Sequence, residues 1–165
     1  YQFFRDYKGA IKDIEELESK VKFDIGFSQN GDYHLNIAKA LCYKAIGQKY
    51  KAIEIINKQL NKEDHFLGLY DYLHLGVLYF EQSKFENAIE AFKKQSDDNE
   101  LAENQFYMAL TYKALKMQSD YEEHLNKAKE LYLVGRKMFD PYTNPMDKIH
   151  YEDIVDELKT ALNKD

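Results

Sequence analysis

The stretch Leu69–Leu101, LYDYLHLGVLYFEQSKFENAIEAFKKQSDDNEL, decides the fold that we predict for this chain. Its aromatic and apolar residues recur with helical spacing in two runs, one on each side of a polar turn, which is typical of a pair of packed helices. Gly76 lies inside the first run, where glycine costs about 1 kcal/mol relative to alanine, so we expect it to let the second helix approach. Ala88 is the matching small residue of the second helix. Ser83 and Glu86 predict a capping box at the start of that helix.

The same segment resembles the tetratricopeptide repeat. Seven positions agree with the family signature in type and spacing, namely Tyr72, Leu75, Gly76, Tyr79, Phe85, Ala88 and Phe92. Tyr72 stands where the family usually has tryptophan. The resemblance implies an all-α fold, a right-handed superhelical stack of helix-turn-helix repeats whose first helices line a concave side.

Weaker copies of the repeat flank this unit. The upstream copy, about 33–66, carries Ala40, Tyr43, Ala52 and Ile56 at the expected offsets. The downstream copy, 102–138, places Ala109 where the middle repeat has Gly76. Its turn is predicted to be longer, with the second helix opening three residues late at Ser119–Glu122. His124 then replaces the small alanine, which predicts looser packing.

The two ends of the chain complete a single predicted domain, 1–165. Residues 1–24 align with the second half of a repeat, so we expect the chain to be a fragment of a longer protein. The segment 23–32, with two glycines, is predicted to be a loop. Near the other end, Pro141 interrupts the helical pattern and Pro145 opens a capping helix of about 145–163, which would cover the last repeat.

Composition argues against several classes of function. The net charge is −6 and there are only two arginines, which disfavours nucleic acid binding. No run approaches the roughly 20 apolar residues of a membrane span, so we expect no membrane insertion. Cys42 is the single cysteine; the lack of disulfides favours a cytosol and is also compatible with a periplasm.

No motif for catalysis, a metal or a cofactor is found. The histidines show no metal-ligand spacing, Glu63, Asp64 and His65 fall where a connection between repeats is expected, and Cys42 has no activating base in its predicted helix. The sequence therefore predicts that the chain is not an enzyme, with no catalytic, metal or cofactor residues.

The concave side is predicted to be an apolar and aromatic groove. The residues expected to line it are Ile37, Leu41, Lys44, Tyr70, Leu73, His74, Val77, Phe80, Phe106, Tyr107, Leu110 and Lys113. The basic clamp with which some tetratricopeptide domains grip a C-terminal carboxylate is absent from these positions. Such a groove suits a peptide or an amphipathic helix laid along it. Equally open is that the chain's own C-terminal helix, or a missing N-terminal part, packs there.

These observations favour a non-catalytic protein-protein interaction module, an adaptor or scaffold whose partner is another protein or a peptide. An alternative is a peptide-sensing regulatory domain that controls an effector domain lost upstream. An open N-terminal end would also allow a homo-oligomer through packing with a second copy.

Overall fold

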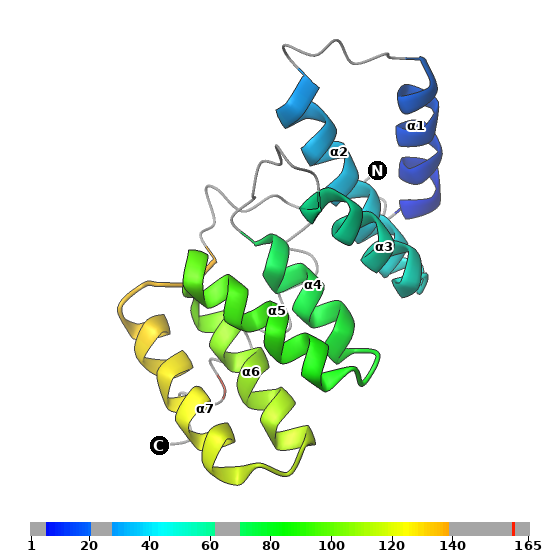
Figure 1. Cartoon of the computed structure of the whole chain (residues 1–165). Helices are drawn as coiled ribbons and strands as arrows, with labels where there is room; N and C mark the ends of the chain where they lie inside the picture. Colours follow the sequence, from blue (N-terminus) through cyan, green and yellow to red (C-terminus); the bar gives the residue numbers. More distant parts are fainter. Residues whose placement is uncertain (1–5, 21–27, 62–69, 139–159, 161–165) are drawn as a thin grey trace. The chain divides into compact units, whose positions relative to one another are not determined.

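The computed structural model describes residues 6–20, 28–61, 70–138 and 160 of the chain. These residues form α-helices and contain no β-strand (Figure 1). The all-α class predicted from the repeats is therefore confirmed for the part of the chain that is described. The chain divides into two compact units, Tyr1–Asp71 and Tyr72–Asp165.

The first unit contains α1 (Tyr7–Lys20), α2 (Ser28–Ala45) and α3 (Lys49–Leu60), and α2 packs against both of the others. α1 begins where the Asp6 carboxylate accepts the main-chain N–H of Gly9 at 2.9 Å, which satisfies a free donor of the first turn. The core between the three helices consists of small and apolar side chains, namely Ile11, Ile37, Ala40, Leu41, Cys42, Tyr43, Ala52, Ile53 and Ile56.

Polar side chains fix α1 on α2 beside this core. The Tyr43 hydroxyl donates to Glu15 at 2.9 Å, and the Lys39 ammonium contacts Glu18 at 2.8 Å. The Lys51 ammonium of α3 lies 5.0 Å from the centre of the Tyr43 ring. Tyr43, a signature position of the repeat, therefore connects all three helices of the unit.

The second unit contains α4 (Asp71–Phe80) except its first residue, together with α5 (Phe85–Asp98), α6 (Ala102–Ala114) and α7 (Gln118–Leu133). α6 lies between α5 and α7 and packs against both (Figure 1). α4 and α5 are in close contact at Gly76, where an ideal Cβ atom would lie only 2.3 Å from Cε1 of the fully buried Phe92. The predicted role of Gly76, to allow the second helix to approach, is confirmed.

Four of the described helices end in the same hydrogen-bonded turn. At the end of α2, the Gly47 N–H donates to the Lys44 carbonyl at 2.9 Å and the Gln48 N–H donates to the Tyr43 carbonyl at 2.8 Å. This is the Schellman arrangement, which satisfies carbonyls of the last helical turn and places one residue in the left-handed region. The left-handed residues after α2, α4, α6 and α7 are Gly47, Ser83, Lys116 and Gly135, with φ of 81°, 57°, 61° and 80°.

The capping box predicted at the start of α5 is wrong. The N-cap residue is Lys84, no side chain makes a capping hydrogen bond there, and Ser83 lies one residue earlier. The Schellman turn explains the difference, because it uses Ser83 as its left-handed residue and so removes it from the capping position.

The late start predicted for the second helix of the third repeat is also wrong. α7 begins at Gln118, directly after the N-cap residue Met117, so its start keeps the spacing of the middle repeat. The same Schellman turn fixes the length of the connection, so the residues that were predicted to lengthen the turn lie in the first turn of α7. The interface does not open at His124, whose ring stacks on Tyr112 with centroids 5.1 Å apart.

The predicted loop 23–32 and the predicted capping helix 145–163 lie only partly within the described residues. Residues 28–32 of the predicted loop are helical, because α2 begins at Ser28 and includes Gly31, which a helix tolerates at a cost of about 1 kcal/mol. The rest of that loop lies outside the described residues. The same is true of the predicted capping helix 145–163, apart from Thr160, which is helical.

Candidate protein-binding surface

In the first unit, the predicted groove residues Ile37 and Leu41 are buried in the core, with relative exposures of 6% and 0%. Tyr70, just before α4, is also buried. Lys44, in the last turn of α2, is half-buried. Of these four, Lys44 therefore offers the most surface to a partner.

In the second unit, the predicted residues separate into a buried and an accessible group. The buried ones lie in the first and middle turns of α4 and α6, namely Leu73, His74, Val77, Phe106 and Tyr107. Phe80 at the end of α4 and Leu110 on α6 are half-buried, and Lys113 in the last turn of α6 is exposed. The accessible part of the predicted set is thus apolar with one basic side chain, and its use as a binding surface stays a prediction.

A group of stacked aromatic rings supports the accessible Phe80. Its ring makes an edge contact with Tyr107, with centroids 5.7 Å apart, and a tilted contact with Phe85 at 6.0 Å. Tyr107 in turn stacks on the fully buried Phe92 at 5.9 Å and an interplanar angle of 19°. Because these contacts restrict the Phe80 ring, binding against it would cost little side-chain entropy.

Lys113 is the cationic side chain of this accessible group. Its ammonium lies 5.3 Å from the centre of the Tyr121 ring on α7, a favourable cation–π distance. Phe80 and Lys113 also occupy the same position in their Schellman turns, since the carbonyl of each accepts the N–H of the left-handed residue. An apolar and a basic side chain are therefore presented at equivalent ends of α4 and α6.

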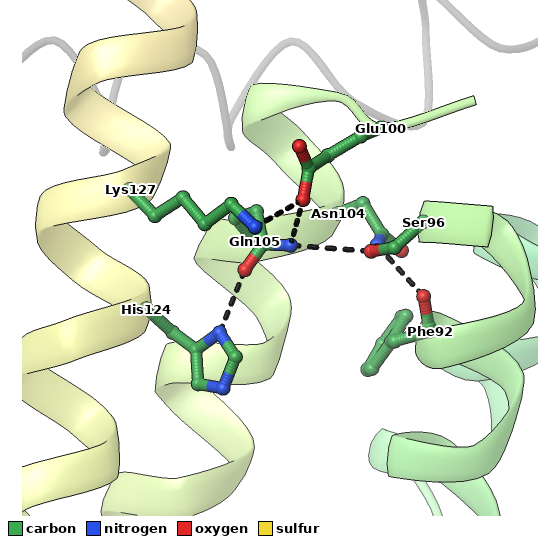
Figure 2. Close-up of polar contacts among 7 residues, drawn as sticks. All are labelled: Phe92, Ser96, Glu100, Asn104, Gln105, His124 and Lys127. Carbon is green, nitrogen blue, oxygen red and sulfur yellow. Dashed lines mark hydrogen bonds and ion pairs between the residues drawn. The ribbon is translucent and has the colours of Figure 1, made fainter.

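A polar network connects α5, α6 and α7 (Figure 2). At one end, the Asn104 amide donates to the Phe92 carbonyl and to the Ser96 hydroxyl, both at 2.9 Å. The Gln105 amide nitrogen donates to Ser96 at 3.1 Å and to the Glu100 carboxylate at 3.0 Å. The sequence did not indicate this network, although Gln105 is a polar residue where the middle repeat has the aromatic Tyr72.

The network also settles the protonation of His124. Because the nitrogen of the Gln105 amide donates to two oxygens, its oxygen faces His124, 2.6 Å from Nδ1, and can only accept. His124 therefore carries its proton on Nδ1. Burial lowers the pKa of His124, which favours the neutral ring. Glu100 completes the network through an ion pair with Lys127 at 2.5 Å, as Figure 2 shows.

In the described residues, neither Cys42 nor a cluster of metal ligands provides a reactive group. Cys42 is 2% exposed, and burial raises the pKa of its thiol to about 11, so the reactive thiolate is disfavoured. Among residues 6–20, 28–61 and 70–138, no group of three or more His, Cys, Asp or Glu side chains could hold a metal ion. Within the same ranges, no helix combines the length and the apolar character of a membrane span.

Comparisons with known proteins bear on the fold. No protein-family model matches the chain, and no curated protein matches it in sequence. A crystal structure of MamA is similar, with a TM-score of 0.63 and 19% sequence identity over 96% of this chain and 86% of the MamA chain. Since MamA has a tetratricopeptide-like fold of helical repeats, the likeness shows that this chain has such a fold.

Proposed function

We propose that the chain is a non-catalytic protein-interaction module, an adaptor or scaffold, which binds a peptide or an amphipathic helix against the ends of α4 and α6. The observation that carries the proposal is that Phe80 at the end of α4 and Leu110 on α6 are partly exposed, and that Lys113 in the last turn of α6 is exposed. Apolar side chains held by a rigid aromatic support can serve as anchors, and a neighbouring cation adds selectivity for an acidic residue. The repeat fold supports the proposal, because tandem helical repeats present extended binding surfaces.

The proposal is narrower than the twelve-residue groove predicted from the sequence. Eight of those side chains are buried, so a partner can reach them only if the chain rearranges. We therefore assign first contact to Phe80, Leu110 and Lys113. The partner that suits them carries an apolar anchor residue and an acidic residue close to it.

Site-specific photo-crosslinking tests this assignment and does not require that the partner be identified first. A photoreactive phenylalanine analogue is placed at position 80, at position 110 and, as a matched control, at position 133 of α7, where Leu133 is 76% exposed. The expected result is one protein crosslinked from positions 80 and 110 and absent from position 133. Equal crosslinking from all three positions would show that the surface is not selective.

Binding of the purified partner then tests the role of the charge. Lys113→Glu should weaken the affinity about tenfold or more, whereas Lys94→Glu, an exposed lysine on α5, should leave it nearly unchanged. The tenfold loss corresponds to about 1.4 kcal/mol, within the range of one well-placed ion pair. Equal losses in the two variants would indicate only a general effect of net charge.

A further inference from the structure

The first half of α6 is buried on every side. All of its residues from Ala102 to Ala109 are buried, whereas α7 keeps an exposed side with polar residues such as Glu123 and Asn126. Successive residues of an α-helix point about 100° apart, so a run of this length faces in every direction. α5 and α7 pack against α6 and cover two of its sides. The side that carries the predicted groove residue Phe106 is therefore covered as well.

The cover is complete over the start of this side and ends towards the last turn of α6. The groove side of α6 consists of residues spaced by three and four, namely Glu103, Phe106, Tyr107, Leu110 and Lys113. The first three are 0%, 5% and 8% exposed, Leu110 is half-buried and Lys113 is exposed. Oε1 of Glu103 is buried and has no hydrogen-bond partner among the described residues, which indicates an apolar surface over it.

The chain that leaves α7 arrives at the covered end of the groove side. The Ala102 N–H donates to the Arg136 carbonyl at 2.9 Å, which satisfies a free donor of the first turn of α6. Two residues further on, the Met138 N–H donates to Oε2 of Glu103 at 3.1 Å. The residues after Met138 therefore start from the place where the groove side is most deeply buried.

The sequence beyond Met138 contains a matching apolar stripe. It consists of residues spaced by three and four in 151–162, namely Tyr151, Ile154, Val155, Leu158, Ala161 and Leu162. Thr160, the described residue of this segment, is helical and exposed. Two residues apart on a helix, Thr160 and Leu158 point to nearly opposite sides. An exposed Thr160 thus fits a segment whose apolar stripe is turned inwards.

The outer side of α7 is a poor alternative place for this stripe. A capping helix packed on the last repeat would cover the exposed side of α7, but that side is polar at Glu123, Asn126 and Glu130. Leu133, the apolar residue at its end, is 76% exposed. The stripe in 151–162 therefore matches the groove side of α6 better than it matches α7.

We propose that residues 151–162 of this chain pack their apolar stripe over the groove side of α6, from Glu103 to Tyr107. The contact is autoinhibitory, because a partner has to displace the segment before it can reach Phe106 and Tyr107. Displacement is aided by the unpaired Oε1 of Glu103, since burying a polar atom without a hydrogen bond is unfavourable. The contact lies within one chain, so it does not rest on the proposed function.

Intramolecular photo-crosslinking of the 165-residue chain tests this contact. A photoreactive phenylalanine analogue is placed at position 158, on the apolar stripe, and in a matched control at position 160, on the opposite side. Mass spectrometry should find position 158 joined to α6 and position 160 not joined to it. Isotopically labelled and unlabelled chains are mixed so that products within one chain can be told from products between two. Equal products from the two positions, products between copies, or attachment of position 158 only to other helices would overturn the proposal.

Solvent accessibility of the groove side gives an independent test. A soluble paramagnetic agent should broaden the NMR signals of the Phe106 ring more strongly in Leu158→Asp than in the unmodified chain. Thr160→Asp adds the same charge on the other side of the segment and should leave Phe106 shielded. The methyl groups of Ile56, which is fully buried in the first unit, should stay shielded in both variants. If Phe106 is equally shielded in Leu158→Asp and in the unmodified chain, the segment is not what covers α6.

Discussion

Gly76→Ala is the substitution that tests the packing of the second unit most directly. Glycine is normally unfavourable inside a helix, and replacement by alanine alone should stabilise α4 by about 1 kcal/mol. At this position, however, the new Cβ atom would lie 2.3 Å from Cε1, 2.4 Å from Cδ1 and 2.9 Å from Cζ of Phe92. Ordinary van der Waals contact begins at 3.4 Å, so the ring or one of the two helices must move.

The size of the effect follows from what the Phe92 ring touches. The ring is fully buried and stacks on Tyr107, so it cannot turn away without disturbing a second aromatic side chain. Overpacking a dense core costs about 1–3 kcal/mol, and the rigidity of this contact favours the upper half of that range. After the gain in helix propensity, we expect Gly76→Ala to lower the free energy of unfolding by about 1–2 kcal/mol.

Urea denaturation followed by far-UV circular dichroism measures this loss, and a double-mutant cycle identifies its origin. Phe92→Leu gives the new methyl group room, so Gly76→Ala should be harmless or stabilising in that background. The coupling energy between the two positions should then be about 1–3 kcal/mol. If Gly76→Ala stabilises the unmodified chain by about 1 kcal/mol, the close approach of α4 and α5 is not as we describe it.

Gly47→Ala is the matched control for Gly76→Ala, because glycine is needed at position 47 for its backbone conformation and not for a close contact. A Cβ atom there would meet nothing within 4 Å, but the residue has φ of 81°, so only the backbone conformation opposes alanine. We expect a loss of about 1 kcal/mol, which no truncation of a neighbouring side chain should rescue.

The remaining predictions concern the helix ends, the thiol and the histidine. Ser83→Gly and Lys116→Gly should each raise the free energy of unfolding by about 0.5–1 kcal/mol, because both residues have a left-handed backbone conformation that glycine adopts more easily. Gly135→Ala should lower the free energy of unfolding for the same reason. Unchanged urea midpoints in these variants would contradict the Schellman turns. Cys42 should react with a thiol reagent at about pH 8 far more slowly in the native chain than in urea, and rapid native labelling would contradict its burial. Since burial lowers the pKa of His124, the contribution of its neutral ring to stability should be lost as pH falls below 6.5. His124→Gln should reduce this loss. Identical profiles of stability against pH in the variant and the unmodified chain would contradict this role of His124.

The sequence by itself determined the helical-repeat fold. The spacing of the signature residues in 69–101 was enough to predict α4, α5 and the close contact at Gly76, because packing two helices at short range requires a small residue at that point. The sequence also showed that recognisable catalytic motifs are absent from it. The turns were harder: the sequence assigned Ser83 to a capping box, since serine is a common N-cap residue, and could not show that it adopts a left-handed conformation instead.

Only the tertiary structure decided which side chains of the predicted groove are accessible. Periodicity places a residue on a face of a helix, but burial depends on what packs against that face, and this left Phe80, Leu110 and Lys113 as the accessible residues of the second unit. The polar network around Gln105 and the buried carboxyl group of Glu103 were likewise invisible in the sequence. Their partners lie on α5, α7 and the segment after α7, and contacts between distant residues are formed only when the helices pack.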